Sequence, residues 1–224
     1  MKFFKSYSQN WYYVGGALFV GLAFLVGFFG DTVNPLSKIL TLSFMALLVH
    51  QFEEYALPGG FPAIMNSAWM GEKEVPDRYP LNRKSAFIVN VIGAYPFYIL
   101  PILFPSLIWL GLAQVLFGMA QILIHGILIN VKMKSWYNPG LAAVVFLHWP
   151  IGIYYIWYVY ANGLIQPWHW LAGIGLTVLA AMLIINLPLQ LLKTKNSEYA
   201  FSPEEMKRFN MPEKLKRLKV GKPG

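Results

Sequence analysis

Six long apolar runs dominate this sequence and limit what the chain can fold into. A helix needs about 20 residues to cross the hydrocarbon core of a bilayer, where unpaired backbone groups find no partner. Charged residues make up only 12% of the 224 residues, against about 25% in an average soluble domain. The sequence therefore predicts an all-α, polytopic membrane helix bundle with six transmembrane helices. The predicted spans are residues 11–30, 36–55, 86–104, 107–130, 141–161 and 170–192.

The basic residues predict how this bundle is oriented. With the N-terminus in the cytoplasm, 17 of the 18 lysines and arginines fall on the cytoplasmic side, and Lys38 alone falls on the outer side. This asymmetry follows the positive-inside rule and predicts that both ends are cytoplasmic (N-in/C-in), with the bacterial inner membrane as the expected location. The net charge of +8 is therefore interpreted as an orientation signal. No basic folded face is visible, so the expected partners are membrane lipids and not nucleic acid.

The chain divides into one membrane domain and one tail. Residues 1–193 hold all six predicted spans, and residues 194–224 are predicted to form a basic cytoplasmic tail. The longest connector, residues 58–84, is also predicted to be cytoplasmic; it opens with Pro-Gly-Gly and is still apolar at Met70. This pattern is typical of a re-entrant or interfacial segment over the bundle, and equally of a connector with aromatic residues at the interface.

The tail carries the signal of a helix start. Ser202 and Glu205 have the spacing of a capping box, and Pro203 occupies the first helical position. We expect this helix to lie on the membrane surface, because clustered cations are attracted to anionic lipid headgroups. The residues that would face the headgroups are Lys207, Arg208, Lys214, Lys216, Arg217 and Lys219.

Ionisable side chains inside the spans mark a candidate functional site. Glu53 and Glu54 are the two acidic residues within the predicted spans, and His50 precedes them by three and four residues. Such groups cost several kcal/mol at membrane depth unless they are paired or hydrated. The i, i+3, i+4 spacing places all three on one helix face. His125 and His148, in spans four and five, lie about 8 and about 12 Å from the cytoplasmic end, so they are expected to meet the first three.

Three imidazoles and two carboxylates that converge in a dry bundle predict a divalent-metal site, with Zn²⁺ as the expected ion. The predicted ligands are His50, Glu54, His125 and His148. By analogy with the inverted zinc motif H-x-x-E-H, Glu53 would be the catalytic base that handles protons, although the two glutamates could exchange roles. Polar residues of spans three and four would orient ligands or hold a substrate oxygen; they are Asn90, Gln121 and Asn130.

The stretch from His50 to Glu54 spells H-x-x-E-E, and the chain resembles the HXXEE family of integral membrane proteins. Tyr55 and the segment Pro58–Pro62, together with Asn66, are also similar to that family. The resemblance covers spans two to five and leaves the basic tail outside. It implies an enzyme of uncertain reaction, and it adds Asn66 to the residues that would orient ligands or bind substrate. A looser likeness to CAAX-type intramembrane proteases fails on two points: no arginine follows the glutamate pair where it is expected, and the histidine spacings differ.

Four classes of function fit these residues. A metal-dependent membrane hydrolase acting on a lipid or amphiphile from the cytoplasmic leaflet is favoured, because ligands, base and depth agree. An iron or haem redox protein would hold its group between His125 and His148. A di-iron centre normally needs about four carboxylates, however, and a haem would leave the glutamates unexplained. A proton-coupled carrier would use His50, Glu53 and Glu54 as a relay. A non-catalytic structural protein would use the polar cluster for packing, and a single interhelical hydrogen bond is then the competing interpretation of His148.

Overall fold

The computed structural model describes residues 2–220, and every regular element in that range is a helix. Six stretches are long and apolar enough to cross a membrane, and their ends lie within four residues of the predicted ones. The prediction of an all-helical chain with six candidate membrane spans is therefore confirmed. The observed spans one to six are Tyr7–Phe29, Pro35–Tyr55, Arg83–Leu103, Ile108–Met133, Leu141–Ala161 and Pro167–Leu192.

The first two spans are α1 (Lys2–Phe29), which kinks at Asn10, and α2 (Pro35–Tyr55), which is an uninterrupted helix. Each later span joins three helical segments end to end. Span three is α4 (Arg83–Phe87), η2 (Ile88–Gly93) and α5 (Ala94–Leu103), and span four is α6 (Ile108–Ile122), η3 (Leu123–Ile129) and α7 (Asn130–Met133). Span five is α8 (Leu141–Ala143), η4 (Val144–His148) and α9 (Trp149–Ala161), and span six is α10 (Pro167–Ala180), η5 (Ala181–Asn186) and α11 (Leu187–Leu192).

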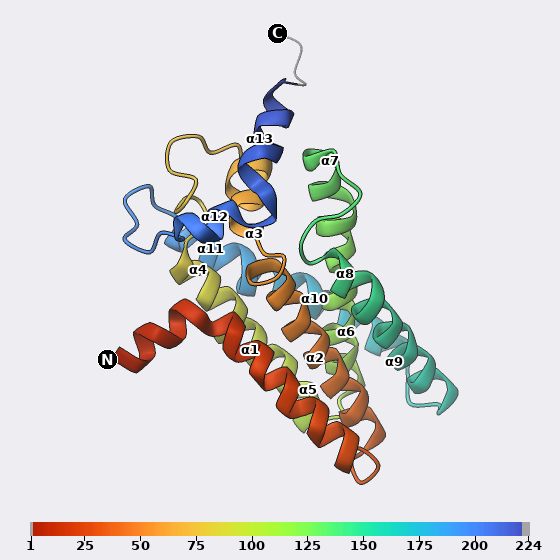
Figure 1. The fold of residues 1–224 in the computed structure, drawn as a ribbon. Helices are drawn as coiled ribbons and strands as arrows, with labels where there is room; N and C mark the ends of the chain where they lie inside the picture. Colours follow the sequence, from red (N-terminus) through yellow and green to blue (C-terminus); the bar gives the residue numbers. More distant parts are fainter. Residues whose placement is uncertain (1, 221–224) are drawn as a thin grey trace.

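Helix α2 lies at the centre of the bundle (Figure 1). It packs against spans one, three, four and five, and 67% of its apolar stretch is buried inside the protein, against 11% for spans one and six. A helix surrounded on all sides by protein must satisfy its polar side chains within the bundle. The position of α2 therefore forces the motif residues at its C-terminal end to find partners on neighbouring spans.

A π-helical turn lies within each of spans three to six, as the segments η2, η3, η4 and η5. Pro96, Pro150 and Pro188 follow η2, η4 and η5 by two or three residues. Proline has no N–H for the carbonyl four residues earlier, and its ring clashes with that carbonyl, so the preceding turn widens. In η4, for example, the Trp149 N–H bonds to the Val144 carbonyl, five residues back. The widened turns rotate the side chains that follow them, and such turns are frequent at functional sites.

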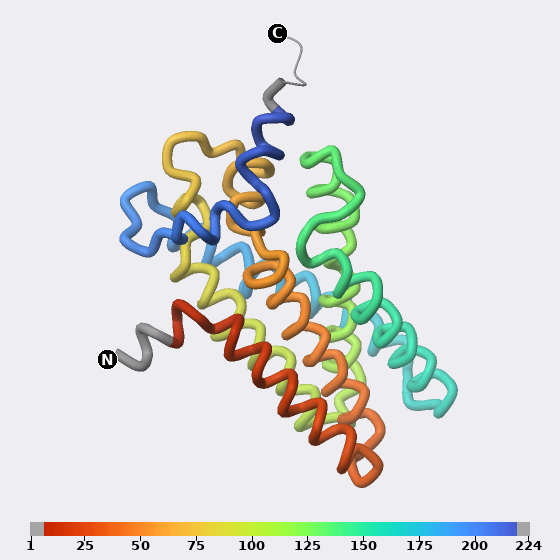
Figure 2. Tube along the Cα trace, viewed as in Figure 1, coloured from red at the N-terminus to blue at the C-terminus, as the bar shows by residue number. Residues whose placement is uncertain are grey.

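The connector after α2 and the C-terminal tail lie together at one end of the bundle (Figures 1 and 2). The connector forms α3 (Phe61–Ala63) and η1 (Ile64–Trp69), and the tail forms α12 (Pro203–Lys207), η6 (Arg208–Asn210) and α13 (Met211–Val220). α12 packs on α3 and α13 packs on η1. Ile64 and Met211 are fully buried in a shared apolar cluster with Met133 at the end of span four. The apolar half of the connector is thus enclosed between the bundle and the tail.

Arg208 differs from the expectation that it faces lipid headgroups. Its guanidinium donates a hydrogen bond to the carbonyl of Tyr55 and another, of 2.9 Å, to the hydroxyl of Tyr13. Tyr55 is the last residue of α2, where carbonyl groups lack intrahelical partners and the helix dipole favours a cation. Arg208 therefore fastens the tail to the end of the helix that carries the motif.

Glu205 fastens the tail to two more spans. The capping box expected from the sequence is present, with the Ser202 N–H 2.6 Å from Glu205 Oε2. The same carboxylate accepts a hydrogen bond from the Tyr12 hydroxyl at 3.2 Å and forms an ion pair with the Arg83 guanidinium. Glu205 is only 5% exposed. Its charge is therefore neutralised by a partner on span three.

We predict that Glu205→Ala lowers the free energy of unfolding by about 1–3 kcal/mol, because it leaves the half-buried Arg83 without its counter-ion. The expected loss is smaller than for a fully buried ion pair, because water still solvates part of Arg83. Denaturant unfolding in mixed micelles measures the change. The control is Glu204→Ala, an exposed neighbour on the same helical turn, which should change stability by less than about 0.5 kcal/mol. Equal losses in both variants would contradict a specific role for the ion pair.

Candidate metal centre

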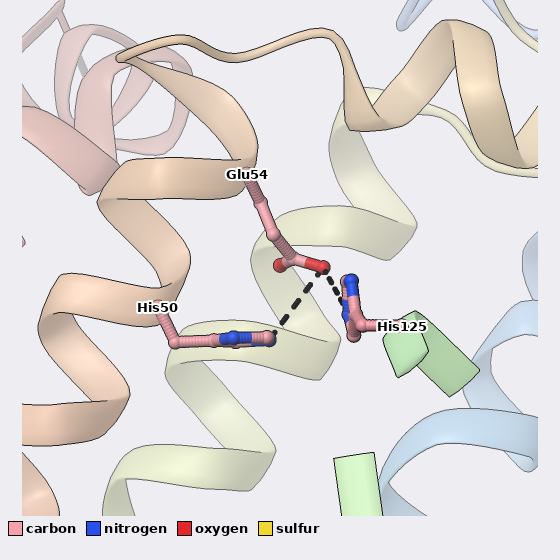
Figure 3. Close-up of side chains that lie close together, drawn as sticks. All are labelled: His50, Glu54 and His125. Atoms are coloured by element: carbon pink, nitrogen blue, oxygen red, sulfur yellow. Dashed lines mark ion pairs between the residues drawn. The ribbon is translucent and has the colours of Figure 1, made fainter. Parts of the chain in front are cut away.

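Three buried side chains from two spans meet below the end of α2 (Figure 3). His50 and Glu54 lie one turn apart on α2, and His125 comes from η3. Glu54 Oε1 lies 3.6 Å from His50 Nε2 and 3.3 Å from His125 Nε2. The three residues are 5%, 5% and 1% exposed. We call these three residues the trio. Among the described residues they form a group of side chains close enough together to bind one metal ion.

The distances within the trio fit a common metal ion. Zinc binds histidine nitrogen and carboxylate oxygen at about 2.0–2.2 Å, so two ligands at tetrahedral positions lie about 3.3–3.6 Å apart. The two separations from Glu54 Oε1 fall within that range, and all three ligand atoms lie within 4.8 Å of one another. The trio thus has the donor types and the spacing of a three-ligand site.

The outer nitrogens of both histidines are held by acceptors. His50 Nδ1 lies 3.0 Å from the carbonyl oxygen of Gly140, and His125 Nδ1 lies 2.7 Å from Asn138 Oδ1. The orientation of the Asn138 amide follows from its Nδ2, which donates to the His125 carbonyl and to Asn130 Oδ1 at 2.7 Å each. Each Nδ1 therefore carries a proton, and each Nε2 points at the Glu54 carboxylate, where a neutral ring would present a lone pair. Lone pairs and an anion repel unless a cation or proton lies between them, and this arrangement is typical of metal-binding histidines.

Glu53 faces a different element from Glu54. Its Oε1 accepts hydrogen bonds from the Tyr137 hydroxyl at 2.8 Å and the Ala142 N–H at 3.1 Å, and its Oε2 accepts one from the Ala143 N–H at 2.8 Å. These amides belong to the first turn of span five, where N–H groups lack intrahelical partners. Burial and the neighbouring Glu53 carboxylate both raise the pKa of Tyr137, so its hydroxyl stays a donor. The role of base that the motif analogy assigns to Glu53 stays a prediction.

His148 lies beside the trio but is not part of it. Its ring centre is 5.8 Å from that of His50, and the residue is 2% exposed. Neither ring nitrogen has a hydrogen-bond partner among the described residues, so the single interhelical bond considered for it is not made there. Gly118 gives the ring its room, since a Cβ at that position would overlap it. An unpaired buried polar group costs about 1–3 kcal/mol, and metal ligation by His148 stays a prediction.

The four predicted polar residues have different surroundings. Asn90 and Gln121 line a cavity beside the trio. Asn130 contacts the site indirectly: its side-chain oxygen accepts a hydrogen bond from Asn138, which in turn contacts His125. Asn66 is fully buried but does not line this cavity; it donates to the carbonyls of Pro76 and Leu81 and accepts from the Leu81 N–H. Asn66 thus shapes the second half of the connector between spans two and three.

Asn138 and Gly140 were not identified from the sequence. They lie in the short connector between two histidine-bearing spans, and Gly140 has a φ of +103°. The sequence signal available was Asn138–Pro139–Gly140, a turn-forming run in the seven-residue connector between Met133 and Leu141. Such runs are common in plain turns. Only the fold reveals that this one contacts both histidines.

The cavity beside the trio has a volume of about 120 Å³. Apart from the trio, Tyr55, Asn90 and Gln121, its walls are apolar. They come from the connector between spans two and three, which includes α3 and η1, and from spans two, three, four and six. Apolar cavities of about 150 Å³ hold a molecule the size of benzene. The arrangement is therefore a narrow apolar chamber with two imidazoles and a carboxylate at one end.

Comparison with known proteins gives one family. The model of a family described as "Protein of unknown function with HXXEE motif" matches residues 41–155, just over half of the chain. That segment contains the whole trio and the connector that holds its histidines. Searches of curated proteins and of solved structures found no match.

We predict that Gly140→Ala disrupts the trio. The added Cβ would lie 2.5 Å from His125 Cε1 and 2.9 Å from His50 Cε1, in addition to the strain of alanine at a positive φ. Gly163→Ala is the matched control, because Gly163 also has a positive φ but no atom within 4 Å of its Cβ position. Gly140→Ala should lower the free energy of unfolding by about 1–3 kcal/mol more than Gly163→Ala. Equal losses would mean that the histidine rings are not packed as described.

Proposed function

Because this chain belongs to the HXXEE family, whose function is unknown, we propose an activity from its own site. The protein is a metal-dependent membrane enzyme that hydrolyses a lipid or another amphiphilic substrate, with Zn²⁺ held by His50, Glu54 and His125. The observation that carries this proposal is the trio itself: two imidazole Nε2 atoms lie 3.6 and 3.3 Å from one carboxylate oxygen, and hydrogen bonds turn both lone pairs toward it.

The donor set favours a catalytic over a structural metal. Structural zinc sites are closed by four protein ligands, whereas hydrolytic sites use three, often two histidines and a glutamate, and leave a position for water. A bound Zn²⁺ would lower the pKa of that water toward 7 and so supply a nucleophile. His50, His125 and Glu54 hold the ion, while Gly140 and Asn138 keep the imidazoles in the binding tautomer. His148, with its unpaired nitrogens, is close enough to act as a further ligand or to hold a substrate oxygen.

The cavity supports an amphiphilic substrate. Its apolar walls suit a short stretch of one hydrocarbon chain, and its volume of about 120 Å³ is well below the ~300–1,000 Å³ of pockets for drug-sized ligands. A bulky ring system such as haem is therefore disfavoured. Asn90 and Gln121 are polar groups on the wall that could hold a carbonyl or hydroxyl near the trio. The substrate class that fits is a single-chain lipid whose polar end carries the scissile bond.

A proton-coupled carrier is the second candidate function. The observation that favours it is a set of buried polar groups without partners, of which His148 lies beside the trio and Tyr98 beside His148. The His148 ring centre lies 6.5 Å from that of Tyr98, and the Tyr98 hydroxyl, like both nitrogens of His148, is unpaired within the described part of the chain. Ser43 Oγ and Gln114 Oε1 are also buried without a partner there. Such groups could relay protons if water joined them.

The distribution of charge supports an N-in/C-in orientation. The tail and the connector between spans two and three hold most of the basic residues, and they lie at the end of the bundle that carries the trio (Figure 1). At the other end, Lys38 is paired with Asp31 at 3.0 Å. The positive-inside rule places the basic end in the cytoplasm. In this orientation the substrate would reach the trio from the inner leaflet.

We predict about one zinc ion, or another divalent ion, per chain in detergent-purified protein. The double variant His50→Ala/Glu54→Ala should lose it, because two of the three ligands are removed. The control is His169→Ala, whose histidine accepts the Gln166 N–H at the start of α10 and should leave metal content unchanged. Mass spectrometry measures the metal content of the wild type, the double variant and His169→Ala. A folded, monodisperse wild type without metal would refute the hydrolase proposal.

Hydrolysis gives the second test of the same proposal. Single-chain amphiphiles with an ester, amide or phosphoester headgroup linkage are presented in micelles to the metal-loaded protein. Activity should disappear on chelation, return with Zn²⁺, and fall at least about 100-fold in Glu54→Gln. Metal binding without hydrolysis of any linkage would turn attention to the carrier, which proton uptake in liposomes would detect.

We predict that the basic end is cytoplasmic, and the cysteine-free chain allows a direct test. Thr32→Cys lies in the connector between spans one and two, and Asn196→Cys lies in the tail; both positions are exposed. A membrane-impermeant maleimide should label Thr32→Cys in intact cells and label Asn196→Cys only after permeabilisation. The reverse pattern would overturn the orientation.

A further inference from the structure

The structure assigns Glu53 a role separate from metal ligation. We propose that Glu53 is a positioning residue: its carboxylate holds the connector between spans four and five against α2, so that Asn138 and Gly140 orient the two histidine ligands. This inference rests on the metal centre proposed above. It names which glutamate of the motif serves the ion directly and which serves it through another element.

The carboxylate of Glu53 grips the connector on both sides of the groups that matter. On one side the Tyr137 hydroxyl donates to Oε1 at 2.8 Å. On the other side the N–H groups of Ala142 and Ala143 donate to Oε1 and Oε2 at 3.1 and 2.8 Å. Asn138 and Gly140 lie between these anchor points in the chain. A segment fixed at residues 137, 142 and 143 leaves little freedom to the residues it encloses.

The enclosed residues are the ones that hold the histidines. Asn138 Oδ1 lies 2.7 Å from His125 Nδ1, and the Gly140 carbonyl lies 3.0 Å from His50 Nδ1. These contacts fix the tautomer and the ring orientation of both ligands, which are the properties that an outer partner of a metal-bound histidine controls. If the connector moved by a fraction of an ångström, both rings would therefore shift, and with them both Nε2 atoms.

A carboxylate suits this role better than an amide. Glu53 receives three donors on two acceptor oxygens, and it is only 7% exposed. A glutamine there would offer one acceptor oxygen, and its NH₂ group would face an N–H or hydroxyl donor. The negative charge also lies against the N-terminus of span five, where the helix dipole favours an anion. The loss of charge should therefore loosen the connector even though the side-chain shape is kept.

The offset of neighbouring helical residues separates the two glutamates. Adjacent side chains on an α-helix diverge by about 100°, so Glu54 faces His50 and His125 while Glu53 faces the start of span five.

The tail also supports the connector. The ring of Phe209, from the tail, packs on Tyr137 with ring centres 5.7 Å apart. Glu53 and both histidines are thus tied together through residues 137–143.

The test compares Glu53→Gln with Glu54→Gln, using Co²⁺ as a spectroscopic probe in place of colourless Zn²⁺. Glu53→Gln should still bind one Co²⁺ per chain, but 10–100-fold more weakly and with an altered visible absorption spectrum. Glu54→Gln should lose the specific spectrum. In metal-free protein, hydrogen exchange at the amides of Ala142 and Ala143 should be at least about ten-fold faster in Glu53→Gln than in wild type.

The matched control is Glu72→Gln. Glu72 also accepts backbone hydrogen bonds, from Lys73, Glu74 and Val75, but it lies in an exposed loop outside the trio and the connector. It should change neither the Co²⁺ spectrum nor exchange at Ala142 and Ala143. Tyr137→Phe removes one of the three donors and should shift affinity and exchange in the same direction by a smaller factor. It provides the test if Glu53→Gln does not fold.

The outcomes are distinguishable. Wild-type Co²⁺ affinity and spectrum in Glu53→Gln, with loss of hydrolysis only, would overturn the positioning role and identify Glu53 as the base. Unchanged exchange at Ala142 and Ala143 would show that Glu53 does not hold the connector. A wild type that binds no divalent ion would refute the metal centre itself, and with it the orientation of ligands, while the exchange measurement would still decide whether Glu53 holds the connector.

Discussion

The absence of hydrogen-bond partners in hydrocarbon is the constraint on which this structure depends. The central helix α2 carries His50, Gln51, Glu53 and Glu54 in little more than one turn, and all four are buried. Each must therefore find its partner on another element. Gln51 donates to Asn90 on span three, Glu53 accepts from span five, and His50 and Glu54 meet His125 of span four. One stretch of α2 thus joins three neighbouring spans through polar contacts at a single depth.

The widened turns explain how those spans present their side chains to α2. Spans three to six each contain a π-helical turn, and η2, η3 and η4 contain Asn90, His125 and His148. Three of the turns precede a proline that cannot continue the normal helical bonding. The same feature that interrupts these helices therefore also adjusts the direction of the residues around the cavity, while α2, which carries the motif, remains a regular α-helix.

The site combines segments inside and outside the family match. The trio and its connector lie within residues 41–155, and the C-terminal tail lies beyond them. The tail nevertheless contacts the site's surroundings at three points: Arg208 bonds to the last residue of α2, Phe209 packs on Tyr137, and Glu205 pairs with Arg83. Its basic surface and its packing are therefore two separate properties. The first is suited to anionic headgroups, and the second encloses the apolar connector over the cavity.

The sequence by itself determined the six spans, because a span is defined by its length and apolar content. Both are local properties of the sequence, and the thickness of the bilayer sets the length required. It also predicted that His50, Glu54 and His125 belong to one site, since depth and helical spacing depend on residue number alone. Tertiary structure decided the rest: that Glu53 turns to span five, that His148 stands beside the trio, that Asn66 lies elsewhere, and that Asn138 and Gly140 hold the ligands. These contacts depend on how each span is rotated and on where a short connector folds, and neither property is encoded in hydrophobic periodicity.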